Sequence, residues 1–178
     1  MRRFHAVAGT SVFVVLAPGV VAGAIPWWLT GWDAGPRLAF EPVWQTVAII
    51  LISAGSAVLL HAIVRFVVEG AGTPAPMGPT DHLVVGGLYR YVRNPMYVAV
   101  TAVILGQALL LNRPVLLLYG LAAWTVNAAF VRWYEEPALS RRFGAEYDAY
   151  RTSVPAWLPR LRPWAPSVEG EGTAGDGG

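Results

Sequence analysis

Cysteine and lysine are missing from this chain of 178 residues, and charge of either sign is scarce. The absence of cysteine excludes disulfide bridges, thiolate catalysis and cysteine-ligated metals. Charged residues make up 13% of the chain, whereas about a quarter is usual in soluble globular domains. Hydrophobic residues reach 55%. This composition excludes a soluble enzyme built on a central sheet, a disordered protein and a nucleic-acid binder.

The few charges are placed so that four long stretches contain none. Each stretch holds between 18 and 27 consecutive residues without Asp, Glu, Lys or Arg. A helix needs roughly 20 apolar residues to cross the hydrocarbon core of a bilayer. The sequence therefore predicts an all-α, polytopic membrane protein with about four transmembrane helices. The predicted spans are residues 6–26, 43–66, 95–111 and 114–134.

Residues between and within these spans predict how the helices are arranged. The short segment 111–114 links the third and fourth spans, so these two spans should form an antiparallel hairpin. Small residues allow helices to approach closely in a membrane. Four tryptophans in or beside the loop 27–42 predict an aromatic belt at one membrane interface. The small residues are Gly19, Gly23, Ser53, Gly55, Ser56 and Ala57, and the tryptophans are Trp27, Trp28, Trp32 and Trp44.

Arginine counts predict the orientation of the spans. Eleven of the 13 arginines flank one side of the predicted bundle, and only Arg37 and Arg113 flank the other. Because arginine is enriched in cytoplasmic loops, we expect both termini in the cytoplasm of a multi-pass protein of a bacterial inner (plasma) membrane. Membrane lipids are then its expected partners, whereas the oligomeric state is left open.

The chain divides into one predicted membrane domain, residues 1–164, and a disordered tail, residues 165–178, which is rich in Gly, Pro and acidic residues. Within the domain, residues 137–153 place four apolar or aromatic side chains at helical spacing, with charged residues on other faces. This pattern predicts an additional C-terminal helix lying on the cytoplasmic interface.

The segment 86–97, Gly-Gly-Leu-Tyr-Arg-Tyr-Val-Arg-Asn-Pro-Met-Tyr, is the first candidate for chemistry. A purely structural interpretation is available, in which Asn94 caps the third span and Pro95 takes its first position. The tyrosines and arginines would then contact lipid headgroups. The sequence alone favours that interpretation.

The second candidate is Arg132-Trp-Tyr-Glu135-Glu136-Pro, at the end of the fourth span. Arg132 and Glu136 are four residues apart and share a helix face, so they could simply pair with each other. Two adjacent carboxylates at a membrane boundary are costly unless a cation meets them, and a positively charged ligand would do so. The histidines have no metal-ligand spacing, which argues against a metal site.

Taken together and in order, these segments resemble the isoprenylcysteine carboxyl methyltransferases and the related phospholipid methyltransferases. The resemblance covers about residues 78–160. One departure is that this chain has Arg-Asn-Pro at 93–95, where prenylcysteine-type members have Arg-His-Pro. The matching residues are Asp81-His82-Leu83-Val84, Gly87-Leu88-Tyr89, Arg93 to Tyr97, Arg132, Glu135-Glu136, Phe143-Gly144, Tyr147, Tyr150, Val154-Pro155 and Leu158-Pro159.

The resemblance implies an integral membrane enzyme that uses S-adenosylmethionine. It implies that Arg132 positions the anionic group of the methyl acceptor. The implied cofactor-binding residues are Asp81, His82, Leu83, Val84, Tyr89, Asn94, Pro95, Met96, Tyr97 and Glu136.

The acceptor is left open by the sequence. A carboxylate is already nucleophilic, whereas an amine would first lose a proton to a base that no motif identifies. The alternative is a small non-enzymatic membrane protein whose arginine-rich face binds lipid headgroups or a partner subunit. A transporter is disfavoured, because no ionisable residue lies near the middle of a predicted span.

Overall fold

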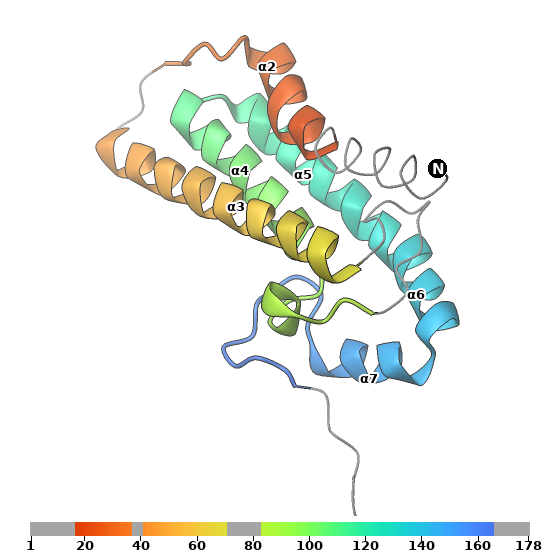
Figure 1. Ribbon diagram of the computed structural model, residues 1–178. Coiled ribbons are helices and arrows are strands. Elements are labelled where there is room, and N and C mark those ends of the chain that lie inside the picture. Colours follow the sequence, from red (N-terminus) through yellow and green to blue (C-terminus); the bar gives the residue numbers. More distant parts are fainter. Residues whose placement is uncertain (1–16, 37–40, 71–82, 166–178) are drawn as a thin grey trace, which may run out of the picture.

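A computed structural model describes residues 17–36, 41–70 and 83–165, and every regular element within these ranges is a helix (Figure 1). Residues 6–16 of the first predicted span, and the predicted tail from residue 166, lie outside the described residues. The elements are η1 (Val20–Ala24), α2 (Ile25–Thr30), α3 (Glu41–Gly70), η2 (Gly87–Arg90), α4 (Pro95–Leu111), α5 (Pro114–Phe130), η3 (Val131–Glu135), α6 (Glu136–Phe143) and α7 (Ala145–Ser153).

Three long helices form the body of the fold, with α4 lying between α3 and α5 (Figure 1). Residues Glu41–Val64 and Pro114–Phe143 are long and apolar enough to cross a membrane. The α4 helix has 17 residues, and its bounds are those predicted for the third span. At 1.5 Å per residue it is about 25 Å long, somewhat less than the hydrocarbon core. The structure thus supports a helical membrane protein, and four spans remain a prediction.

Two glycines allow α3 and α4 to approach closely. A Cβ atom on Gly55 would lie 2.9 Å from Val103 Cγ2, and one on Gly106 would lie 2.7 Å from Ile52 Cγ1. Each helix therefore presents a glycine to the other helix. The two helices can then pack in van der Waals contact, which a larger residue at either position would prevent.

Other small residues do not have the packing role that the sequence predicted. Among the described residues, no atom outside their own stretch of helix lies within 4 Å of the position that a Cβ of Gly19 or Gly23 would take. Ser53, Ser56 and Ala57 are exposed on the outer side of α3. The prediction of close helix approach is wrong for these five, because composition does not tell which face of a helix meets a neighbour.

The predicted hairpin between the third and fourth spans is confirmed. Asn112 ends α4 in the left-handed conformation, with φ 50° and ψ 45°, and Pro114 begins α5. The Gly35 amide also donates to the Leu111 carbonyl at 2.7 Å, and Arg113 Nε donates to the Asp33 carbonyl at 2.9 Å. The segment after α2 is thereby fastened to the turn.

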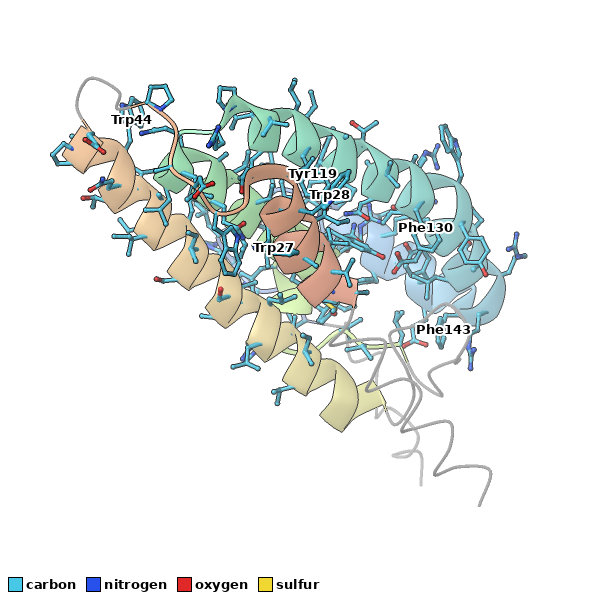
Figure 2. The ribbon with its side chains drawn as sticks, turned by 90° about the horizontal axis from the view of Figure 1, so that it is seen from above. Trp27, Trp28, Trp44, Tyr119, Phe130 and Phe143 are labelled. Atoms are coloured by element: carbon cyan, nitrogen blue, oxygen red, sulfur yellow. The ribbon has the colours of Figure 1, made fainter. Side chains whose placement is uncertain are left out.

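The outward faces of α3 and α5 are strongly apolar. Large side chains such as Ile50, Leu60, Leu118 and Val126 are more than half exposed, which suits contact with lipid and not with water. The tryptophans predicted to form a belt are exposed as well, and Figure 2 shows Trp44 near the Glu41 end of α3.

The π-helical turn η1 is held by polar side chains of the neighbouring helices. Gln107 Nε2 donates to the Ala22 carbonyl at 2.6 Å, and the Tyr119 hydroxyl donates to the Val21 carbonyl at 2.7 Å. A π-turn disturbs the usual hydrogen-bond ladder. Donors from α4 and α5 satisfy two carbonyls of this turn within the protein.

The C-terminal interfacial helix predicted over 137–153 is instead two helices, α6 and α7. Gly144 separates them with φ +52°, a conformation that residues with a side chain rarely adopt. The apolar side of α7 turns inward, because Tyr147 and Tyr150 are only 2% and 3% exposed. Amphipathic spacing identified the apolar side correctly, but the protein itself covers that side.

Candidate active site

Glu136 is the centre of a polar cluster at the end of the apolar helices. It is the first residue of α6, and only 5% of it is exposed. The chain enters α6 through the π-turn η3, which widens the helix by about one residue per turn. The adjacent carboxylates of Glu135 and Glu136 both reach residues at the Pro95 end of α4.

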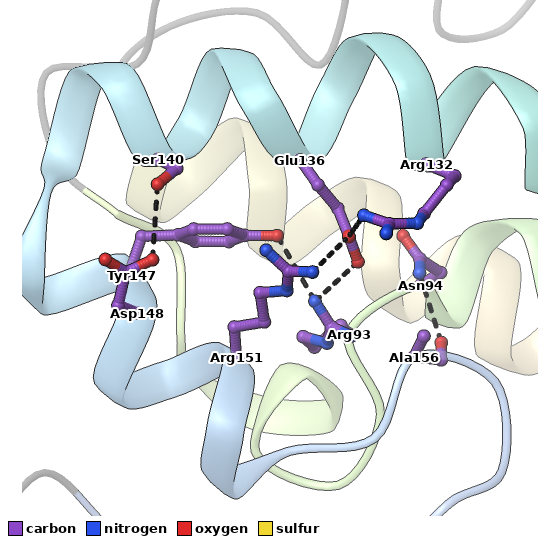
Figure 3. A network of polar contacts seen from close by, with 9 residues as sticks. All are labelled: Arg93, Asn94, Arg132, Glu136, Ser140, Tyr147, Asp148, Arg151 and Ala156. Atoms are coloured by element: carbon purple, nitrogen blue, oxygen red, sulfur yellow. Dashed lines mark hydrogen bonds and ion pairs between the residues drawn. The ribbon is translucent and has the colours of Figure 1, made fainter.

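Arg93 makes the shortest contact with Glu136 (Figure 3). Its Nη1 lies 2.7 Å from Glu136 Oε1 and 3.3 Å from the Tyr147 hydroxyl. The two charged side chains are 12% and 7% exposed, so the pair is almost completely withdrawn from solvent. The Arg93 backbone is fixed as well, because its amide donates to the Pro155 carbonyl at 2.9 Å.

Two more arginines approach the other oxygen of Glu136. Arg151 Nη2 lies 3.4 Å from Oε2 with 39% of its side chain exposed, and Arg132 Nη1 lies 3.8 Å away with 67% exposed. The predicted pairing within one helix face therefore exists, but it is the longest and most exposed of the three contacts. Three guanidinium groups meet one carboxylate, which leaves an excess of positive charge suited to an anionic ligand group.

A second acidic contact lies beside this cluster. The Tyr97 hydroxyl, on the first turn of α4, donates to Glu135 Oε2 at 3.2 Å. The two glutamates thus have different partners, a phenol for Glu135 and guanidinium groups for Glu136. Each of the two adjacent carboxylates next to the membrane therefore has polar partners of its own.

The α7 helix is packed against the segment before α4. The Tyr150 hydroxyl donates to the Tyr89 carbonyl at 2.7 Å, inside a small core. Burial raises the pKa of both Tyr147 and Tyr150, and Arg93 opposes part of that rise. This packing brings Arg151 to Glu136 and the Tyr147 hydroxyl to Arg93. The core consists of Tyr147, Tyr150 and Val154, with Leu83, Val85, Leu139, Phe143 and Trp164 around it.

Asn94 stands before α4 as predicted, but its side chain does not cap the helix. Its Nδ2 donates instead to the Ala156 carbonyl at 3.1 Å, from a position that is 7% exposed. An amide can provide this donor at any pH. The prediction of a capping side chain is wrong, since the side-chain amide bonds to the segment after α7 and makes no hydrogen bond to the first turn of α4.

The structure brings many of the predicted cofactor residues to one end of α4. Leu83, Val84 and Met96 are half-buried, whereas Tyr89 and Pro95 are buried beside Asn94. Arg132 lies at the solvent-exposed edge of the cluster. Asp81 and His82 lie outside the described residues.

Four residues of this cluster were not singled out as site residues from the sequence. They are Arg93, Glu135, Tyr147 and Arg151. Arg93 and Glu135 adjoin predicted residues, so their positions in the two motifs were a usable signal. Nothing in the local pattern around Arg151 distinguishes it from the other arginines on its helix.

The fold and the site together define a helical membrane protein with a buried carboxylate and three arginines at one end of its apolar helices. The sequence model of the phospholipid methyltransferases matches residues 43–146, and the chain belongs to this family.

Two curated proteins that are similar to this chain are named as methyltransferases. The chain is 34% identical over 121 residues to a protein-S-isoprenylcysteine O-methyltransferase of Schizosaccharomyces pombe, an alignment that covers 67% of this chain and 51% of the relative. It is 28% identical over 95 residues to a phosphatidylethanolamine N-methyltransferase of Phaeosphaeria nodorum, which covers 51% of this chain and 10% of that protein. The chain thus spans about half the length of the first relative and a tenth of the second.

Proposed function

We propose that this protein is a membrane methyltransferase that moves a methyl group from S-adenosylmethionine to a lipophilic or small acceptor. The observation that carries the proposal is the buried Glu136 carboxylate, surrounded by arginines in a chain of the phospholipid methyltransferase family. One relative is named for methylation of a carboxyl group and the other for methylation of an amine, so both acceptor classes are considered.

The residues of the cluster suit the charged groups of S-adenosylmethionine. Its ammonium group would pair with Glu136, and its carboxylate would take guanidinium donors. Arg93 Nε is buried and has no hydrogen-bond partner among the described residues, so one donor remains available. Leu83 and Met96, which are half-buried, would offer apolar contacts to the cofactor. When bound, the cofactor supplies a methyl group activated by a sulfonium.

The other predicted cofactor residues belong to the same proposal. Tyr89, Asn94, Pro95 and Tyr97 would shape the pocket at the start of α4, with Val84 beside them and with Asp81 and His82 on the segment that precedes them. In-line methyl transfer needs position and a dry site more than it needs a reactive side chain. The shielded Glu136 cluster supports such a site.

Arg132 is proposed to hold the anionic group of the acceptor. Its long, exposed contact with Glu136 is the weakest of the three, so its guanidinium can turn to another partner at the smallest cost. A guanidinium binds a carboxylate or a phosphate through two parallel hydrogen bonds. This role accommodates a carboxylate acceptor as well as an amine attached to a phospholipid.

Glu135 would be needed for one of the two acceptor classes and not for the other. A carboxylate acceptor needs no base, whereas an ammonium acceptor has to lose a proton before its nitrogen can attack. Glu135, which accepts a hydrogen bond from Tyr97, is the proposed recipient of that proton. Glu135→Gln should therefore abolish methylation of amines and leave carboxyl methylation largely intact.

Calorimetry with purified protein in detergent tests the proposal. The wild type should bind S-adenosylmethionine, whereas Glu136→Ala and Tyr97→Ala should not. Glu146→Ala, on the exposed side of α7, is the matched control and should bind normally. Normal affinity in both site variants would contradict the site assignment.

The non-enzymatic alternative makes different predictions in the same experiments. It predicts no binding of S-adenosylmethionine to the wild type, and it predicts that Glu136→Asp is tolerated. Mass spectrometry of lipids incubated with protein and isotopically labelled cofactor would identify the acceptor. Four spans and cytoplasmic termini are part of the proposal, because a polar cofactor would have to reach the site from the cytoplasm.

A further inference from the structure

The segment after α7, residues 155–164, returns to the membrane-facing helices instead of leaving the protein. We call it the returning loop. Its backbone is fixed at two points, since the Arg160 amide donates to the Tyr91 carbonyl at 3.0 Å and the Trp164 amide donates to the Arg90 carbonyl at 2.9 Å. The backbone of this loop is therefore fixed against the rest of the protein.

A tryptophan pair shows that the returning loop lies along the side of α5. The rings of Trp157 and Trp124 meet edge to face, with centroids 5.8 Å apart. Because α4 and α5 form a hairpin around Asn112, Trp124 is level with Val100, which is five residues inside α4. At 1.5 Å per residue this contact is about 8 Å inside the Pro95 end of the apolar helix.

The two leucines of the returning loop point away from the protein, whereas its two tryptophans pack against it. Leu158 is 79% exposed and Leu161 is 99% exposed, although the backbone around them is held in place. Exposed leucines on a fixed backbone leave apolar surface in water without any gain from packing. Acyl chains beside the exposed face of α5 would cover the same surface.

The backbone of the returning loop also suits a poorly hydrated place. An N–H group exposed to lipid without a partner costs several kcal/mol. Pro155, Pro159 and Pro163 have no N–H group, and the amides of Arg160 and Trp164 are bonded within the protein. Five of the ten residues of the loop therefore have no unpaired backbone N–H group.

The charges of the returning loop indicate which lipid it meets. The loop contains two arginines and no acidic residue. Arg160 Nη1 donates to the Ser153 carbonyl at 2.7 Å, whereas Arg162 is exposed next to Leu161. A cation beside inserted apolar residues is typical of a segment that binds an anionic membrane surface.

We propose that the returning loop is an interfacial membrane anchor at the Pro95 end of α4. Leu158 and Leu161 insert at the boundary of the acyl chains, and Arg162 binds anionic headgroups. The loop also carries the carbonyls that hold Arg93 and Asn94, so the anchor connects the lipid surface to the cluster around Glu136. This inference does not depend on the proposed methyltransferase activity.

Quenching of site-specific probes measures the depth of the loop. The chain has no cysteine, so Leu158→Cys and Leu161→Cys can each be labelled with nitrobenzoxadiazole in the full-length protein. The variants are placed in nanodiscs of phosphatidylcholine with and without phosphatidylglycerol. Leu118→Cys, on the lipid-facing side of α5, and Glu146→Cys, on an exposed polar side of α7, are the matched controls.

Nitroxide-labelled lipids should quench the probes at both loop positions several-fold more strongly than the probe at Glu146, and about as strongly as the one at Leu118. Iodide in the aqueous phase should give the reverse order. Quenching equal to that at Glu146 would overturn the proposal. Protection from both quenchers would also overturn it, because a second copy or another part of the chain would then cover the loop.

The headgroup contact has its own test. With phosphatidylglycerol present, Arg162→Gln should reduce lipid quenching of the probe at Leu161, and it should have little effect in pure phosphatidylcholine. The same quenching with and without Arg162 in the anionic nanodiscs would overturn the role of this arginine.

Discussion

Arg93→Met should be the most destabilising of three matched substitutions around Glu136. The Arg93 contact is 2.7 Å long and nearly buried, so removal of the guanidinium leaves the carboxylate without its best donor. Breaking a buried ion pair from one side costs roughly 3–5 kcal/mol. Arg151 and Arg132 remain at 3.4 and 3.8 Å, which places the expected loss near the lower end, about 3 kcal/mol.

The three arginines form a graded series. Arg151→Met should cost less than Arg93→Met, because its side chain is 39% exposed and its contact is longer. Arg132→Met should cost under about 1 kcal/mol, the value typical of exposed pairs. The double variant Arg93→Met/Glu136→Gln should lose less stability than the sum of the single changes, because it removes the unpaired buried charge.

Intrinsic fluorescence during thermal unfolding in detergent can measure this series, since the chain has eight tryptophans. For a chain of this length, a loss of about 3 kcal/mol corresponds to a fall in Tm of about 6–12 °C. Arg141→Met, at an exposed position on α6, is a control for the loss of one surface arginine. The reasoning is refuted if Arg93→Met lowers Tm no more than Arg132→Met or Arg141→Met does.

Two other predictions concern helix packing and pH. Gly106→Ala should lower Tm by about 4 °C or more, because the added Cβ would lie 2.7 Å from an α3 side chain, whereas Gly19→Ala has open space and should leave Tm unchanged. Burial raises the pKa of Tyr150, so the folded state favours the neutral phenol. The contribution of Tyr150 to stability should therefore be constant below the ordinary tyrosine pKa near 10 and should fall as pH rises above it. Tyr150→Phe should make the alkaline fall in Tm less steep, and an unchanged slope in thermal-unfolding scans would contradict the assignment.

Much of the helix layout could be predicted from the sequence, since it follows from local chemistry. Charge-free runs and prolines gave the bounds of Pro95–Leu111, and the short connection to Pro114 implied the hairpin. The break at Gly144 was missed, because glycine within an amphipathic pattern is tolerated in many helices. The apolar side of α7 was placed against lipid, although in the structure it packs on Leu83 and Val85.

The candidate site could be predicted only in part. Glu136 and Arg132 share a helix face and were considered as a pair from the sequence, and that contact exists. The dominant contact joins Arg93 to Glu136 across 43 residues, and it depends on how η3 and α7 pack against the start of α4. Local patterns determine which residues can share a helix face, whereas tertiary packing determines which of several arginines a buried carboxylate meets.

Gly144 shows how a residue without a side chain can control a polar cluster. Among the described residues no atom beyond its chain neighbours lies within 4 Å of the place its Cβ would occupy, but at φ +52° a side chain would be strained against its own backbone. This positive φ reverses the chain, so that Arg151 reaches Glu136 and the Tyr147 hydroxyl reaches Arg93. In a mutational scan, substitutions at this position would resemble defects in ligand recognition. Their origin would be the direction in which the polypeptide leaves α6, and restoring individual contacts elsewhere would not repair it.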